Sequence, residues 1–431
     1  MSISPELLGL LHDAKMHPED DAPRLILADW LEEHGQPERA EFVRLQCGKP
    51  SFDDGVQVLV LLRENYERWC GPASSNLGLD NSRGLLRLGG PLEYCLAEPL
   101  PAGLPPDLPA WVEAVSLDSF STDWLPALTR SPLARELSTL RVRLPRSSAP
   151  EWTSEAEHIT AIGNWLDLRA IPALPGLTNL AIETPHLGTQ GLECLLRADL
   201  SRLRYLSLYS SRIGNEGVQS LTEYRQLGPL QTLALSACRL GPRAAELLAD
   251  WRGLATVKRL MLWNNELGAD GVTALAQSPH RDALEDWSLS VPSADPEAEP
   301  GSVMGPAGAV GIAMARPFPC LRILDLRDQQ IGLVGAQSLA HSLAFPVLEV
   351  LQLESNRIGD EGFQALLEAP WMPQITSLSL QGNGLTYRSI HALLKCSRLH
   401  PDLFLDFGRM PGLYDSMRRR VKARFGDKVR C

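Results

Sequence analysis

The sequence predicts an α/β solenoid, a curved horseshoe with parallel strands on its concave face and helices on its convex face, preceded by a small helical module. Two observations support this fold class: a leucine pattern that returns about every 27 residues, and a glycine signal that keeps the same period. Two independent patterns in one register indicate stacked repeats. The chain, at 431 residues, is long enough for such an array.

The leucine pattern is L-x-x-L-x-L, in which apolar and polar residues alternate as in a short strand with one buried face. It starts at Leu177, Leu203, Leu230, Val257, Leu284, Leu321, Leu348 and Ile375. All the spacings are 26 or 27 residues except the one after Leu284, which is 37. We expect strands at 179–182, 205–208, 232–235, 259–262, 286–289, 323–326, 350–353 and 377–380.

The glycine signal follows each strand pattern and permits a tight turn. It stands at Gly188, Gly214, Gly241, Gly268, Gly332 and Gly359. The segment after Gly271 then has helical periodicity, with Val272 and Leu275 on one side. One strand and one helix cannot bury their own apolar faces, so the units must stack in parallel.

These units, such as Val257–Ala276 and Leu348–Leu367, resemble the ribonuclease-inhibitor class of leucine-rich repeat. The asparagine of that class stands at Asn265, Asn356 and Asn383. It is replaced at Ser211, Cys238, Gln329, Pro185 and Pro292. The resemblance implies that asparagine or cysteine at this position hydrogen-bonds the backbone of the turn.

A second resemblance covers Pro18–Cys47, which is similar to the bacterial repeat-companion domain, a short helical module that precedes leucine-rich repeats. We expect helices at 6–16, 21–34, 37–47 and 56–69. The apolar side of the second is assigned to Leu25, Ile26, Ala28, Trp30 and Leu31.

The expected organisation has four parts. They are a companion module at 1–70, degenerate repeats at 71–176, about eight regular repeats at 177–400 with an insertion at 291–303, and a C-terminal cap with a basic helix at 401–431. Degenerate strand patterns start at Leu85, Val112 and Leu137, and a last strand is expected at Leu403–Phe407. Terminal repeats are expected to be atypical because they cover open apolar ends.

The composition favours a cytoplasmic protein. The eight cysteines are scattered and no export signal or long apolar segment stands in the sequence. The net charge of −11 argues against general nucleic-acid binding, and the acidic middle of the chain favours a basic protein partner. The oligomeric state is left open.

No catalytic motif was found, and no cofactor or metal is expected. The run from Gly305 fits the glycine register of the repeats better than a phosphate loop. The histidines His12, His17 and His34 lie among acidic residues, but their spacing favours a solvated helix face over a metal site. The basic C-terminal helix favours a cap over a phosphate contact.

The concave face is the predicted binding surface. Its aromatic and arginine-containing patch, a composition enriched at interface hot spots, comprises Tyr205, Tyr209, Arg259, Met261 and Trp263. Its charged patch comprises Asp325, Arg327, Gln352 and Glu354. Tyr209 and Trp263 are expected on one face about 10 Å apart, since two strand spacings separate them, with Arg259 near Trp263.

The insertion would place an acidic loop with Asp295, Glu297 and Glu299 on the rim, either as a functional loop or as neutral decoration. The preferred function is a non-catalytic module that binds a protein partner. Two alternatives stay open: a regulator of an enzyme, either an inhibitor or similar to the repeat proteins that activate small GTPases, and a purely structural repeat protein.

Overall fold

The computed structural model describes most of the chain and divides it into two compact units. The described residues are 4–17, 20–48, 52–70, 78–82, 85–89, 107–117, 137–143, 176–185, 187–291, 303–410 and 413–431, with the single positions 105, 128, 131 and 174. Unit 1 comprises Met1–Tyr205 with Gln226–Gly228, and unit 2 comprises Leu206–Arg225 with Pro229–Cys431.

Unit 1 begins with four helices and continues with strands. Its elements are α1 (Pro5–Met16), α2 (Ala22–Glu33), α3 (Pro37–Arg44), α4 (Phe52–Cys70), β1 (Gly78–Ser82), β2 (Leu85–Gly89), α5 (Leu108–Trp111), β3 (Val112–Leu117), β4 (Thr139–Arg143), β5 (Asn179–Glu183) and α9 (Gly188–Leu195). Strand β1 pairs antiparallel with β2, and β2 to β5 pair in parallel. The four expected helices and the three degenerate strands are confirmed.

Two buried arginines attach the helical module to helix α5 and strand β3. Arg24 of α2 donates to the carbonyls of His17 and Asp20 and lies 3.8 Å from the buried Glu113 of β3. Arg39 of α3 stacks 3.4 Å from the ring of Trp111. Burial lowers the pKa of Arg39 to about 9, so its guanidinium stays charged at neutral pH. The module therefore packs on α5 and β3 through compensated charges as well as apolar side chains.

The apolar side assigned to α2 is partly wrong. Leu25 and Ile26 are 41% and 55% exposed, whereas Arg24, Leu27 and Leu31 are buried. Residues spaced by three and four share a helix face, so Arg24 falls on the buried side with Leu27 and Leu31. A buried position held by a charged residue is invisible to a search for apolar residues.

Unit 2 repeats one strand and one helix. Its elements are α10 (Gly214–Glu223), β7 (Thr232–Ala234), α11 (Pro242–Asp250), η5 (Arg252–Thr256), β8 (Arg259–Met261), α12 (Gly268–Gln277), β9 (Asp286–Ser288), α13 (Gly305–Ala313), β10 (Ile323–Asp325), α14 (Gly332–Ala340), β11 (Val350–Gln352), α15 (Gly359–Glu368), η6 (Met372–Gln374), β12 (Ser377–Ser379), α16 (Tyr387–Lys395), β13 (Phe404–Asp406), α17 (Asp415–Phe425), η7 (Gly426–Lys428) and β14 (Val429–Arg430). The short strand β6 (Tyr205–Ser207) spans the boundary between the units.

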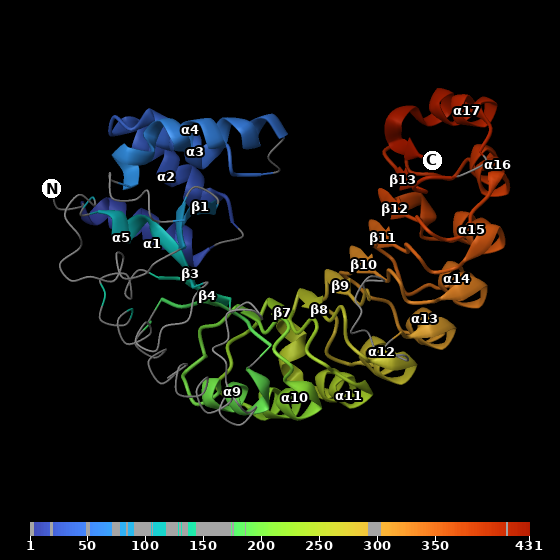
Figure 1. The fold of residues 1–431 in the computed structure, drawn as a ribbon, viewed down its shortest axis with the longest axis horizontal. Coiled ribbons are helices and arrows are strands. Elements are labelled where there is room, and N and C mark those ends of the chain that lie inside the picture. Colours follow the sequence, from blue (N-terminus) through green and yellow to red (C-terminus); the bar gives the residue numbers. More distant parts are fainter. Residues whose placement is uncertain are drawn as a thin grey trace, which may run out of the picture. The chain divides into compact units, whose positions relative to one another are not determined.

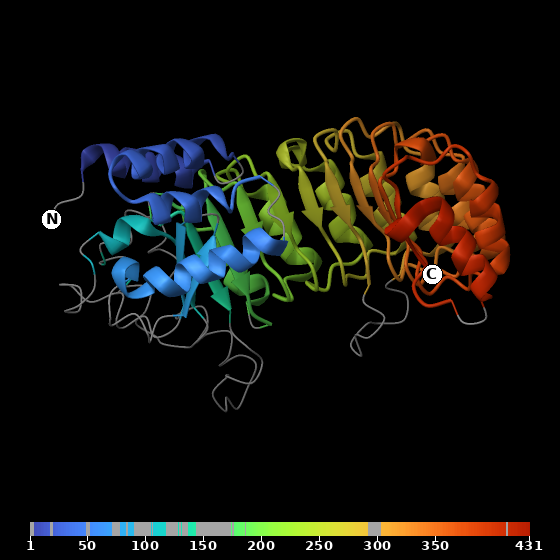
Figure 2. The ribbon, with the colours of Figure 1, turned by 90° about the horizontal axis from the view of Figure 1, so that it is seen from above.

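The strands of unit 2 lie side by side in sequence order. Parallel pairing joins β7 to β8 and continues through every neighbour to β14. Within this unit, β7 to β13 follow the inner side of an arc and the helices α10 to α16 its outer side (Figure 1), and Figure 2 shows the same two layers from above. The expected parallel strands, concave sheet and convex helices of unit 2 are confirmed.

The core of unit 2 lies between the sheet and the helices. Its strand leucines Leu324, Leu326, Leu351 and Leu353 are almost fully buried, as the alternation predicts. Gly271 shows how closely the helices pack, because a Cβ there would lie 2.9 Å from the Cβ of Ala245 in the preceding repeat. A small residue is therefore required at this position.

Buried asparagines link successive repeats at the turn after each strand. The Asn356 side chain accepts hydrogen bonds from the backbone amides of Gln329 and Ile331, in the preceding repeat, and donates to the carbonyls of Leu326 and Glu354. Asn265 and Asn383 make equivalent bonds. These residues, with their counterparts Cys238 and Gln329, are called the amide ladder below.

The amide ladder fixes a strained turn. Ser355 and Arg357, on either side of Asn356, adopt left-handed backbone angles, with φ of 57° and 56°. Such angles cost about 1–2 kcal/mol for residues with a side chain. The hydrogen bonds of the intervening buried amide offset that cost and satisfy backbone groups that water cannot reach.

Substituted positions of the ladder keep its role. The thiol of Cys238 donates to the carbonyl of Leu208 at 2.8 Å. Gln329 donates to the carbonyl of Leu289 and accepts from the amide of Met304 at 2.8 Å. Leu289 and Met304 lie on the two sides of the long repeat's insertion, so Gln329 holds both ends of that segment.

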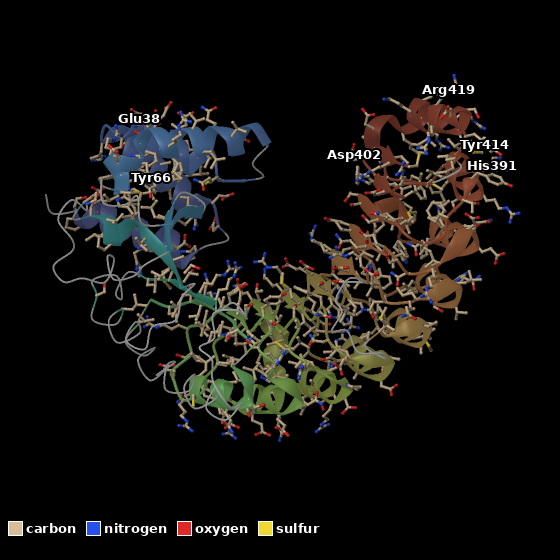
Figure 3. All side chains as sticks on the ribbon, in the orientation of Figure 1. Glu38, Tyr66, His391, Asp402, Tyr414 and Arg419 are labelled. Atoms are coloured by element: carbon tan, nitrogen blue, oxygen red, sulfur yellow. The ribbon has the colours of Figure 1, made fainter. Side chains whose placement is uncertain are left out.

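The C-terminal helix closes the last repeat. Arg424 of α17 donates to the carbonyls of Leu394 and Cys396 at the end of α16, and β14 pairs with β13. Positive groups are favourable at a helix C-terminus because they oppose its dipole. Arg419, on the same helix at the C-terminal end of unit 2, remains exposed (Figure 3). These contacts agree with the predicted capping role.

Replacing Leu351 by alanine should destabilise unit 2 by ~2–5 kcal/mol, because the change removes buried contacts and leaves a cavity. Denaturant unfolding measures the loss in free energy of unfolding. The control is Gln352→Ala, whose side chain lies on the concave, solvent-facing side of the same strand. We expect the control to change the free energy of unfolding by less than about 1 kcal/mol. A small loss for Leu351→Ala would contradict the inward register.

Candidate functional site

The register of the strands arranges the concave face of unit 2 in three columns of outward residues. The first column contains Arg259, Asp286, Ile323 and Val350, and the second contains Met261, Ser288, Asp325 and Gln352. Just after the strands, the third column continues through Trp263, Ser290, Arg327 and Glu354. Neighbouring residues within a column lie on adjacent strands, about 4.8 Å apart.

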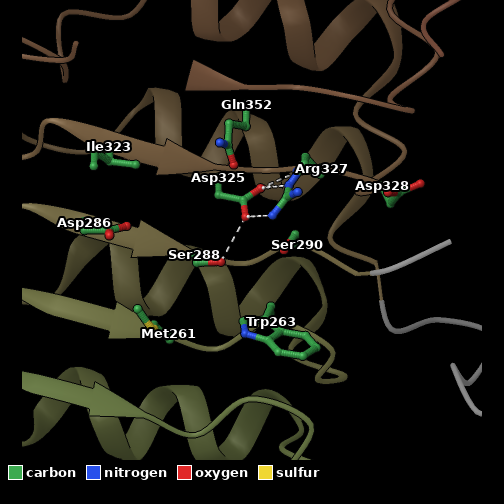
Figure 4. Close-up of a pocket in the computed structure, with 10 residues that line it drawn as sticks. All are labelled: Met261, Trp263, Asp286, Ser288, Ser290, Ile323, Asp325, Arg327, Asp328 and Gln352. Atoms are coloured by element: carbon green, nitrogen blue, oxygen red, sulfur yellow. Dashed lines mark hydrogen bonds and ion pairs between the residues drawn. The ribbon is translucent and has the colours of Figure 1, made fainter. Parts of the chain in front are cut away.

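A groove opens where two of these columns carry serine. Ser288 and Ser290 form a low floor, Met261 and Trp263 stand on the preceding repeat, and Asp325 and Arg327 stand on the following one (Figure 4). Asp286, Ile323, Asp328 and Gln352 complete the lining, and the cavity volume is about 460 Å³. The hollow therefore arises from small residues between larger neighbours on a regular sheet.

A salt bridge forms one wall of this groove. The Asp325 carboxylate accepts two hydrogen bonds from the Arg327 guanidinium, at 2.9 and 2.8 Å, and a third from the Ser288 hydroxyl at 3.1 Å. Asp325 is only 5% exposed, so it is less open than the sequence suggests. Bidentate bonds of this kind are strong and directional, which makes the wall rigid.

Two carboxyl groups, one in the groove and one beside it, have incompletely compensated negative charge. Burial raises the pKa of the Asp286 carboxyl, with Arg259 opposing and Asp325 reinforcing that shift. Burial also raises the pKa of Glu354, whose buried Oε2 has no hydrogen-bond partner among the described residues. A cation would stabilise the charged form of both carboxyl groups.

An aromatic pair lies beside the groove. The rings of Tyr209 and Trp263 are 5.1 Å apart between centroids and tilted by 38°. The expected separation of about 10 Å is therefore wrong for the rings, because the two side chains lean toward each other across the small intervening Ser236. Ser236 is only 1% exposed, and both aromatic residues remain half-buried.

The other members of the predicted aromatic patch are less closely grouped. Arg259 directs its Nε to the Thr232 hydroxyl at 3.1 Å, and its charge acts on Asp286. Tyr205 is half-buried and belongs to unit 1. The groove thus unites Met261 and Trp263 with Asp325, Arg327 and Gln352. The two predicted patches did not include Asp286, Ser288, Ser290, Ile323 and Asp328, although the two serines between larger residues of the neighbouring repeats were a readable signal.

The acidic rim residues Asp295, Glu297 and Glu299 lie outside the described residues. Within the described ranges, no group of three histidine, cysteine or acidic side chains could hold a metal ion. Nor does any helix among them combine the length and apolar character that a membrane span requires.

Comparison with known proteins agrees with the repeated unit. Residues 319–340 and 346–367 match a family model described as a leucine rich repeat. These stretches contain strand β10 with helix α14, and strand β11 with helix α15. No curated protein matches the chain.

The match and the repeated parallel strands agree on one fold class, the α/β solenoid of leucine-rich repeats. Leucine-rich repeats generally mediate protein–protein interaction and are typically non-catalytic.

Removing residues 293–302 should leave the fold of unit 2 intact, because Gln329 holds backbone groups on both sides of the segment. Circular dichroism and a melting curve measure the effect, and we expect the melting temperature to stay within about 3 °C, the change that ~1 kcal/mol would cause. The full-length chain with Asp295, Glu297 and Glu299 changed to their amides controls for lost charge. A large drop for the deletion would show that the loop packs as structure.

Proposed function

We propose that this chain is a non-catalytic interaction module that binds a protein partner on the concave face of unit 2. The observation that carries the proposal is the half-exposed aromatic pair Tyr209–Trp263 beside an open groove. Tyrosine and tryptophan give large contact areas with little loss of side-chain entropy and are enriched at hot spots. Ribonuclease-inhibitor-type repeats and the companion module remain resemblances that agree with this role.

The surroundings of the pair support binding more than internal packing. The strands and turns beneath it are held by parallel pairing and by Asn265, whose side-chain amide bonds its own turn and the preceding one. A rigid support lowers the entropic cost of association. A cytoplasmic setting also fits, because the described cysteines are all free thiols, which reducing compartments preserve.

The double change Tyr209→Ala and Trp263→Ala should weaken partner binding at least ~30-fold, the equivalent of ~2 kcal/mol for one hot-spot residue. The full chain would be used to capture partners from extracts of the native cells, and the captured protein would then be purified. Its dissociation constant for wild type and variant, measured by calorimetry, gives the result.

The matched control is Tyr387→Ala with Tyr414→Ala, which removes two aromatic side chains that are 50% and 69% exposed. We expect the control to bind normally. A purely structural repeat predicts the opposite for the Tyr209 and Trp263 variant: a lower melting temperature from lost ring contacts, with unchanged affinity. That outcome would end the binding proposal.

A further inference from the structure

We propose that the groove between β8, β9 and β10 binds the guanidinium group of an arginine side chain presented by the partner. This inference rests on the proposed protein-binding function and adds the chemistry that the partner must display. The groove, the aromatic wall and the excess of carboxylates carry it.

The shape of the groove suits a flat, elongated side chain. Ser288 and Ser290 leave a floor, while Trp263 and Met261 stand along one side (Figure 4). An arginine buries its methylene stem against apolar groups and stacks its planar head on an aromatic face. A tryptophan ring attracts a cation more strongly than other aromatic rings do.

The charge of the groove suits a cation. Of its ten lining residues, Asp286, Asp325 and Asp328 are acidic and only Arg327 is basic. Arg327 is bound to Asp325 and therefore compensates that carboxylate first. The lining therefore has more carboxylates than cations, with Arg259 beside Asp286 on the neighbouring strand.

Asp286 is the most suitable carboxylate to receive the ligand. It lines the groove two residues before Ser288 on β9, between Arg259 and Ile323 of the neighbouring strands, and burial raises the pKa of its carboxyl. Asp325 shows that a carboxylate in this groove can bind a guanidinium, because it already accepts two hydrogen bonds from Arg327. A second guanidinium in the hollow would lie among the carboxylates of Asp286 and Asp325 and the ring of Trp263.

The test uses three peptides that differ in one side chain: acetyl-Gly-Arg-Gly-amide, its citrulline counterpart and its lysine counterpart. Citrulline keeps the shape of arginine without the charge. Titration into the full chain would be followed by NMR through the indole N–H signal of Trp263, assigned with Trp263→Phe. We expect the arginine peptide to bind with a dissociation constant on the order of 1 mM, since one stacked and ion-paired side chain supplies modest energy.

Asp286→Asn should weaken arginine binding at least about 5-fold, while the control Asp270→Asn, on the outer helix α12, should leave it unchanged. Should Asp286→Asn disturb folding, Met261→Ala tests the same groove through its apolar wall. The proposal would be overturned if the citrulline peptide bound as tightly as the arginine peptide, or if neither groove variant changed the affinity for arginine. Equal binding of lysine would overturn the choice of a guanidinium.

The peptide test can fail separately from the binding module itself. The Tyr209 and Trp263 variant could lose the protein partner while the arginine peptide fails to bind the wild-type chain. That result would support the interaction module and reject the arginine site. Conversely, the groove variants could weaken binding of the arginine peptide while the Tyr209 and Trp263 variant still binds the protein partner. That result would support the cation site and reject the proposed aromatic contact.

Discussion

The amide ladder is the interaction on which the geometry of unit 2 depends. Strands β7 to β13 are each only three residues long, so their backbone hydrogen bonds involve only a small part of each repeat. A buried amide such as Asn356 adds four hydrogen bonds to two successive turns. Because a buried polar group that loses its partners is costly, each repeat accepts only one placement on the next.

This fixed placement turns sequence differences into surface shape. The backbone of each repeat is nearly the same, so the height of the concave face at each point is set by side-chain size. Ser236 and Ser290 are equivalent residues of different repeats, yet their surroundings differ. The aromatic pair leans over Ser236, whereas Ser290 stays between Trp263 and the salt-bridged Arg327 and leaves a groove.

Most of the fold was predicted from the periodicity of leucine and glycine in the sequence. The leucine alternation located the strands of unit 2, because a slip of one residue would expose every leucine. The glycine register located helix starts, including Gly305 beyond the insertion. The face of α2 was misassigned because Arg24 is buried through specific partners, which no apolar pattern reveals.

The candidate site was predicted less completely, for reasons of the same kind. Listing outward residues identified Tyr209, Trp263, Asp325 and Arg327, since strand alternation is local. It could not show that two rings would meet across a serine, that Arg327 would cover Asp325, or that two serines would leave a groove. Those features depend on side-chain direction, and the Ser288–Asp325 and Tyr209–Trp263 contacts join residues 37 and 54 positions apart.

The claim that concave shape determines recognition is tested most directly by filling the groove. Ser290→Leu should raise the floor between Trp263 and Arg327, and Ser338→Leu, on the outer helix α14, adds the same volume elsewhere. The dissociation constants of the purified protein partner and of the arginine peptide would be measured for both variants, with melting curves. We expect at least a 10-fold loss of both affinities for Ser290→Leu alone, with an unchanged melting temperature. Full affinity in a folded Ser290→Leu variant would contradict it.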